Sequence, residues 1–387
     1  MKDEDIFANW AERYGGAFNF VPDKPGSTFL QNELDDLRTL ASEGVKFCHD
    51  LARSQSPPPV IQPEVYVGLV HNPEFTAFAF QERKREFIAV FTGTIEIIYS
   101  LCYRVMSHSA TRPGVGCPGK EFPPEKIPFI PTNAEEWIER GRSNGDLRQP
   151  TPKPQDQVRQ HYAHLLARVV LDYILLHEFG HLCAGHLSLD HEVSARGLVT
   201  QCSETGAYKL SPLTDQTLEL NADSFAAGAC LRTAIDRHLN PDEAVIPIWK
   251  PFYQDLRGAI ETHCFAIYLF FRIFEIAQEP LADLENGTHP PARVRMACAT
   301  AIMKSHLSDA GYDSLAECFI SGLMQSVMQE VDITVDLLTI LASKRYQATA
   351  HEQNRHNSQI LSLQNHWSNV VYPRLLPHSR SGLINRL

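Results

Sequence analysis

The stretch from Leu165 to Leu187, LLARVVLDYILLHEFGHLCAGHL, contains the pentapeptide HEFGH at residues 177 to 181. Its apolar residues recur with helical rather than strand spacing, which predicts a buried helix. Four residues apart on that helix, His177 and His181 lie on one face and can direct two imidazole rings at the same metal ion. Glu178 lies about 100° round the helix from His177, beside such an ion, where a carboxylate can act as a base on water. The stretch therefore predicts a metal site on a rigid helix.

The pentapeptide by itself also fits a pair of histidines on a helix surface next to an ion-paired glutamate. A catalytic zinc ion takes three protein ligands and leaves one position for water, so a third ligand is needed. A third histidine in the pattern HxxGxxH would require glycine at 184 and histidine at 187, but the sequence has Ala184 and Leu187. That class of metallopeptidase is excluded, and a glutamate on a second helix remains.

Glu219 fits the place of this glutamate. It lies with Asp223 in LELNADSFA, residues 218 to 226, on a helix predicted from about residue 215 to residue 239. Two carboxylates four residues apart, with no Lys or Arg at that distance, are unfavourable on a helix unless they face a cation. We expect Glu219 to bind the metal and Asp223 to accept the outward N–H of a ligand histidine, which fixes its tautomer. The alternative is an exposed acidic pair.

These motifs resemble those of a known family. HEFGH with His186 five residues later, then LELNADSFA, then THPPARVRM at residues 288 to 296 are similar to motifs of the M48-like gluzincin metallopeptidases, the group around Ste24 and HtpX. FTAFA at residues 75 to 79, with FTG at 91 to 93, looks like that family's NAFA strand and glycine-bearing turn, although Thr76 replaces the usual asparagine. The resemblance implies a zincin-like core with one catalytic Zn²⁺ per chain. A soluble bacterial zincin of the phage-exclusion type, which cuts a host protein, is compatible with it by analogy of fold.

The resemblance also implies roles for later residues. His289 is expected to donate to the oxyanion, because a histidine directly before two prolines is held stiffly; the alternative is a cap on the following helix. Arg295 matches the family's arginine and is expected to hold Glu219 or Asp223 in place, the alternative being a surface arginine. The expected edge strand, which would receive an extended peptide substrate by backbone hydrogen bonds, consists of Phe75, Thr76, Ala77, Phe78 and Ala79.

The resulting hypothesis is a zinc endopeptidase with the ligands His177, His181 and Glu219 and with Glu178 as general base. One alternative is a catalytically inactive zincin-fold binding or regulatory protein, and another is a hydrolase of a non-peptide amide. A purely structural zinc would need a fourth protein ligand, for which Cys183, Cys202 and His186 are available. For His186, His191 and His263 an ordinary hydrogen-bonded histidine is the favoured interpretation.

Patterns along the rest of the chain predict an α+β fold that is mainly helical. Strand-like runs at 65 to 69, 75 to 80 and 87 to 91 predict a small antiparallel sheet, the last two forming a hairpin with a charged turn at 81 to 86. We expect an N-terminal helical segment (1–60), a zincin-like metallopeptidase domain (61–310) with a Pro-rich insertion (108–155), and a C-terminal helical extension (311–387).

Composition restricts the partners. The net charge of −11 argues against nucleic acid, which requires a basic surface. The expected partner is the protein or peptide substrate of the predicted peptidase. MKDEDIFANW at the start has no basic region followed by an apolar core, and no apolar run reaches the ~20 residues of a membrane span. Nine cysteines without a CxxC pair indicate reduced thiols and favour the cytoplasm.

Overall fold

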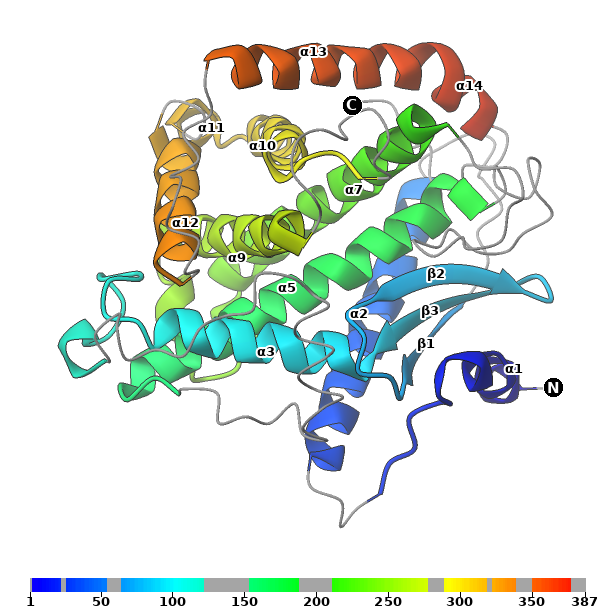
Figure 1. Cartoon of the computed structure of the whole chain (residues 1–387), viewed down its shortest axis with the longest axis horizontal. Coiled ribbons are helices and arrows are strands. Elements are labelled where there is room, and N and C mark those ends of the chain that lie inside the picture. The colour runs from blue at the N-terminus through cyan, green and yellow to red at the C-terminus, as the bar shows by residue number, and fades with distance from the viewer. Residues whose placement is uncertain are drawn as a thin grey trace.

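The HEFGH stretch lies on helix α5 (Gln157–Ala184), which runs through the middle of the molecule (Figure 1). Asp156 caps its start by accepting hydrogen bonds from the backbone N–H groups of Val158 and Arg159. The helix ends at Gly185, whose φ of 77° is in the left-handed region that glycine adopts without strain. Nearly every side chain from residue 162 to residue 184 is buried, so α5 forms a rigid base for the histidines.

The computed structural model describes residues 2–21, 26–53, 64–121, 153–187, 211–277, 289–318, 322–338 and 350–376. Most of the expected Pro-rich insertion, residues 122–152, lies outside this part of the chain, as do His191 and Cys202. Within the described ranges, no helix combines the length and the apolar character that crossing a membrane would require.

The sheet is mixed, so the expectation of an antiparallel sheet was wrong. Its strands are β1 (Val65–Val70), β2 (Ala77–Glu82) and β3 (Arg85–Phe91), in the order β1-β3-β2. The predicted hairpin of β2 and β3 is confirmed, but β1 pairs with β3 in parallel. The chain leaves β1 and reaches the far edge of the sheet before it turns back, and β3 therefore runs in the same direction as β1 between the other two strands.

The turn of the hairpin is tighter than expected. Only Arg83 and Lys84 separate the strands, and both have positive φ, 53° and 65°. Two consecutive residues with positive φ are typical of the type I′ turn, whose twist matches that of the strands it joins. This turn places β2 at the open edge of the sheet, next to α5.

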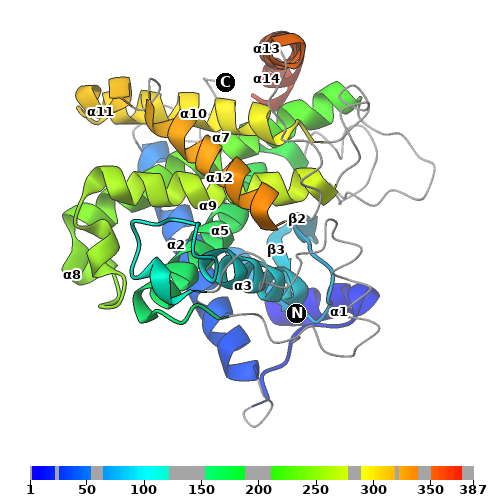
Figure 2. The ribbon, with the colours of Figure 1, turned by 60° about the vertical axis from the view of Figure 1, so that its left-hand side comes forward.

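Four helices surround α5: α2 (Ser27–Arg53), α3 (Thr92–Met106), α7 (Pro212–Leu239) and α9 (Leu256–Ala277). Figures 1 and 2 show α7 alongside α5. The two helices approach closely at Gly180, where an added Cβ atom would lie 3.2 Å from Cα of Ala222. Glycine in HEFGH therefore brings the helix that carries Glu219 against the helix that carries the histidines.

Aromatic residues cover the face of the sheet that is turned away from α5. Phe7 and Trp10 of α1 (Asp3–Ala11) pack against the rings of Phe78 and Phe80, and Phe80 stacks in turn on Phe87. Trp10 stacks on Phe80 with ring centroids 4.0 Å apart. This packing covers one face of β2 and leaves the open edge of the strand facing α5.

Later helices enclose the other side. They are α8 (Pro241–Ala244), α10 (Ala292–Asp309), α11 (Asp313–Cys318), α12 (Met324–Leu338), α13 (Ala350–His366) and α14 (Tyr372–Leu375). Helix α12 packs across α9, and α13 crosses α7 and α10 (Figures 1 and 2). Asp332 of α12 forms ion pairs with Arg272 and Arg293, which ties α12 to α9 and α10. The start of α10 is thereby held next to α7.

Candidate metal centre

Three side chains from two helices converge at one point. His177 and His181 of α5 and Glu219 of α7 each offer one ligand atom, and these atoms lie within 4.8 Å of one another. The Nε2 atoms of the two histidines are 3.1 Å apart, and Oε2 of Glu219 lies 3.1 Å from Nε2 of His177. All three residues are buried, so the alternatives of a surface histidine pair and of an exposed acidic pair are wrong.

The chemistry of this group fits a cation. Oε2 of Glu219 is buried and accepts no hydrogen bond from any described residue, although Nε2 of His177 and of His289 both approach it to 3.1 Å. An unsatisfied, ionised oxygen in the interior is costly unless a positive charge offsets it. Burial raises the pKa of Glu219, but the nearby His289 and His181 outweigh it and hold that pKa well below its usual value. The carboxylate is thus charged and directed at the point where the ligand atoms meet.

The surroundings of His177 also favour a positive charge at this point. Burial lowers its pKa, but the nearby carboxylates of Asp223 and Glu219 raise it to about 10. Nδ1–H donates to Oδ1 of Asp223 over 2.9 Å, so the second proton of the charged ring is on Nε2, facing His181 and Glu219. A metal ion would displace that proton and take its place between the same ligands.

The carboxylate of Asp223 orients the ring of His177. It is fully buried and accepts hydrogen bonds from the Tyr173 hydroxyl and from Nε and Nη2 of Arg295, each over 2.7 Å. Burial favours the neutral carboxyl, but the Arg295 guanidinium outweighs it and holds the pKa of Asp223 below its usual range. Arg295 is 8% exposed, so the alternative of a surface arginine is wrong, and it holds Asp223 rather than Glu219.

The second histidine is oriented through a relay of two more residues. Nε2–H of His186 donates to Oδ1 of Asn221 over 3.1 Å, because an amide oxygen only accepts. Burial holds the pKa of His186 well below its usual value, so the ring is neutral and its Nδ1 accepts. Nδ1–H of His181, 2.8 Å away, supplies the proton, and this leaves Nε2 of His181 bare toward the metal site. Burial also lowers the pKa of His181 to about 4, which keeps Nε2 available as a ligand.

This relay gives His186 a role in orienting His181. It also includes Asn221, which the sequence analysis missed. His186 is hydrogen-bonded, as expected, but through Asn221, a residue that no motif had singled out. Among the described residues, neither His186 nor Cys183 joins the three ligand atoms as a fourth. A signal for Asn221 was present, since it lies two residues after Glu219, on the helix that carries the third ligand.

Glu178 lies beside the ligand atoms and faces the sheet. Its Oε2 accepts a hydrogen bond of 2.7 Å from the backbone N–H of Ala79 in β2. Burial raises its pKa to about 7, even though the charged His177 lowers it. A carboxylate with a pKa near neutrality can both accept and return a proton, which suits a general base.

The open edge of β2 presents backbone groups to the same region. The backbone N–H of Phe91 donates to the carbonyl of Thr76, and in an antiparallel pair the bonded residues alternate. The N–H and C=O groups of Ala77 and Ala79 therefore point away from β3, toward the open edge. The strand begins at Ala77 rather than at the expected Phe75, because Thr94 Oγ1 binds both backbone groups of Thr76.

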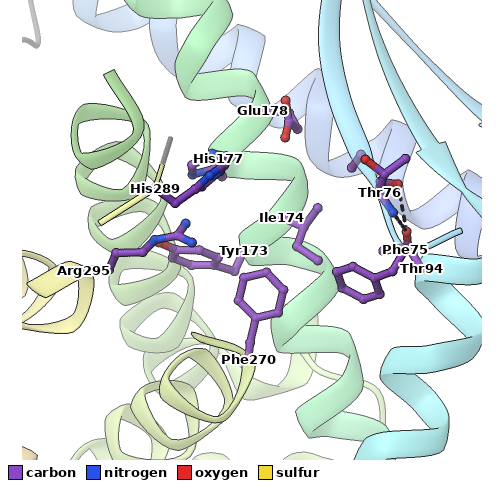
Figure 3. Close-up of a pocket in the computed structure, with 11 residues that line it drawn as sticks. Phe75, Thr76, Thr94, Tyr173, Ile174, His177, Glu178, Phe270, His289 and Arg295 are labelled. Atoms are coloured by element: carbon purple, nitrogen blue, oxygen red, sulfur yellow. Dashed lines mark hydrogen bonds between the residues drawn. The ribbon is translucent and has the colours of Figure 1, made fainter. Parts of the chain in front are cut away.

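A pocket opens between this edge, α5 and the start of α10 (Figure 3). Its lining includes Glu178 and His177 together with Phe75, Thr76, Ala77, Thr94, Tyr173, Ile174, Phe270, His289 and Arg295. No side chain caps the start of α10, so the alternative in which His289 is a helix cap is wrong. Phe78 does not line the pocket, because its ring packs under α1 on the opposite face of the sheet.

Comparisons with protein-family models, with curated proteins and with solved structures found no match to this chain.

Proposed function

We propose that this chain is a zinc-dependent endopeptidase with a zincin-like core. The observation that carries the proposal is the meeting of His177, His181 and Glu219 beside a pocket that also exposes Glu178. Two histidines and one glutamate, with a position left for water, are the ligands of one class of catalytic zinc site. A structural zinc would have no use for a glutamate of raised pKa beside it. Seven cysteines in the described part of the chain are free thiols, and the proposal includes a reducing compartment such as the cytoplasm.

A zinc ion bound at this site would supply a water nucleophile near neutral pH and polarise the carbonyl under attack. Glu178 accepts a proton from the water as its oxygen bonds to the carbonyl carbon of the peptide. When the bond between that carbon and the amide nitrogen breaks, Glu178 returns the proton to the leaving amine. The hydrogen bond from Ala79 holds the carboxylate of Glu178 in position to take the proton from the water and to return it to the leaving amine.

His289 is the proposed donor to the carbonyl oxygen as that oxygen becomes negative. Its imidazole lies over Glu219 and lines the pocket, on the side of the site away from the sheet (Figure 3). Removing one such donor typically costs ~10² to 10³ in rate. The role is distinct from that of a ligand, and a His289 variant should keep its zinc.

The proposed substrate is an extended peptide bound along β2. The outward N–H and C=O groups of Ala77 and the outward C=O of Ala79 can pair with such a peptide in the manner of an added strand. Because the Ala79 N–H is bonded to Glu178, the edge and the general base are adjacent. A peptide aligned on this edge would pass directly over the ligand atoms.

The test compares wild type, Glu178→Gln and Glu219→Ala, with zinc content and cleavage of an unfolded protein such as reduced casein as readouts. We expect Glu178→Gln to keep zinc and lose ~10² to 10⁴ in rate, and Glu219→Ala to lose zinc. Glu243→Gln, an exposed glutamate on α8, is the matched control and should change neither. Full cleavage by Glu178→Gln, or full zinc content in Glu219→Ala, would overturn the proposal.

The same experiment separates the alternatives. An inactive zincin-fold binding protein would hold zinc through Glu219 but show no cleavage in the wild type. A hydrolase of non-peptide amides would leave casein intact and hydrolyse small acyl amides in a reaction that depends on Glu178. The raised pKa of Glu178 favours an active enzyme over the binding protein.

A further inference from the structure

The pocket next to the metal site has an apolar end. Phe270 of α9 lies between Phe75 and Tyr173, with ring centroids 6.3 Å and 6.1 Å from theirs (Figure 3). Ile174, one turn before His177 on α5, completes this end. His177 and Glu178 line the opposite end, so the pocket extends from the metal site to a group of aromatic side chains.

The volume of the pocket limits what it can hold. It is about 70 Å³, and an apolar cavity of ~150 Å³ accommodates one benzene molecule. A phenyl ring therefore does not fit unless Phe270 or Phe75 moves. An aliphatic group of three or four carbons, such as the side chain of valine or leucine, matches the available space.

Arg295 and Thr94, which also line the pocket, already have partners within the protein. The Arg295 guanidinium binds both oxygens of Asp223 and lies 4.4 Å over the ring of Phe271. The Thr94 hydroxyl is engaged with the backbone of Thr76. A charged substrate side chain placed between Phe75, Ile174 and Phe270 would lose hydration against apolar side chains, which is costly.

The position of the pocket relates it to the bond that is cut. Thr76 and Ala77, at the beginning of the β2 edge, form one wall, and His177 and Glu178 form another. Side chains of an extended peptide point alternately to opposite faces. A peptide paired with β2 would therefore direct one side chain into the pocket while its neighbouring carbonyl faces Glu178.

We infer that this pocket selects a small, branched aliphatic side chain on the residue next to the scissile bond, and that Phe270 sets the upper size limit. The inference rests on the proposed peptidase activity and specifies its substrate class. Phe270 is suited to this role because it enters from α9, outside the segments that supply the ligands and the base. Changing its size alters the pocket without touching the chemistry.

The test uses two peptides that differ only in having leucine or phenylalanine at the cleavage position, with wild type, Phe270→Ala and Phe270→Leu. We expect wild type to favour the leucine peptide in kcat/KM, and Phe270→Ala to shift the preference toward phenylalanine by ~10-fold or more. Phe270→Leu keeps more of the buried volume and should shift it in the same direction by less. Leu269→Ala, which changes the neighbouring buried residue of α9 outside the pocket, is the control and should leave the ratio unchanged.

A binding measurement separates this inference from the proposed function. Zinc-loaded Glu178→Gln, alone and combined with Phe270→Ala, is titrated with both peptides, and fluorescence anisotropy reports their affinities. We expect Phe270→Ala to shift the ratio of the two binding affinities toward the phenylalanine peptide, as in kcat/KM. An unchanged ratio in both assays, with cleavage still dependent on Glu178, would overturn the inference and leave the peptidase intact. If wild type cleaves neither peptide but the shift in binding preference is observed, the proposed peptidase activity is wrong and the inferred selectivity of the pocket still holds.

Discussion

The backbone N–H of Ala79 donates a 2.7 Å hydrogen bond to Oε2 of Glu178, across 99 positions of sequence. It joins the edge of the sheet to the side chain that we propose as general base. The substrate-binding edge and the proton acceptor are therefore held as one unit.

Replacing Ala79 with proline should lower kcat by ~10-fold or more and leave the zinc content unchanged. The change removes the donor to a charged acceptor, and a hydrogen bond of that kind contributes about 1.5–3 kcal/mol. Because the N–H points away from β3, the proline breaks no hydrogen bond between the strands. Ala77→Pro is the matched control, since it alters the same edge without touching Glu178, and we expect it to raise KM instead. Equal kcat for Ala79→Pro and wild type would disprove the link.

Substitution of Asn221 should weaken metal binding although Asn221 is not a ligand. Asn221→Leu leaves the Nε2–H of His186 without its acceptor, and His181 then loses the partner that keeps its Nε2 bare. Loss of such an outer partner typically costs ~10- to 100-fold in metal affinity. Competition for Zn²⁺ with a chromophoric chelator measures this. Ser224→Ala, a buried hydroxyl on the same helix bonded to a backbone carbonyl, should keep wild-type affinity. Wild-type affinity in Asn221→Leu would contradict the relay.

Removal of the Arg295 guanidinium should destabilise the metal-free protein by about 1.5–3 kcal/mol, because Arg295→Met removes two charge-assisted hydrogen bonds from the buried carboxylate of Asp223 and leaves His177 as its remaining charged partner. Urea unfolding measures the free energy. Arg85→Met removes an ion pair with Asp3 whose arginine is 50% exposed, and it should cost no more than about 1 kcal/mol. If the two variants lose similar stability, Arg295 does not support Asp223 as described.

Acid should destabilise the metal-free protein partly through His263, which is remote from the metal site. Burial, with a smaller contribution from Arg237, lowers the pKa of His263 to about 3. Above pH ~6.5 the ring is neutral in the folded and the unfolded chain and does not affect stability. Between pH ~6.5 and about 3 only the unfolded chain binds the proton, so the free energy of unfolding falls by about 1.4 kcal/mol per pH unit.

The variant His263→Gln should therefore show a shallower loss of stability between pH 6 and pH 4. Urea unfolding at several pH values in the presence of a chelator measures the slope. His71→Gln, which replaces an exposed histidine, is the control. A slope equal to that of wild type in His263→Gln would show that His263 takes up its proton without unfolding.

Local patterns determined the parts of the site that lie within one helix. The four-residue spacing of His177 and His181 places both on one face wherever a helix forms, and the same holds for Glu219 and Asp223. The hairpin of β2 and β3 could be predicted because two apolar runs flank a short charged turn. These features depend on neighbours in sequence, so the sequence was sufficient to predict them.

Tertiary structure decided which of these elements meet. The parallel pairing of β1 with β3, the relay from Asn221 to His181 and the position of Phe270 in the pocket all join residues that local periodicity leaves unrelated. The close approach of α5 and α7 at Gly180 depends on the packing of both helices in the core. Helical spacing specifies the direction of a side chain relative to its own axis, but only packing specifies which other helix or strand lies on that side.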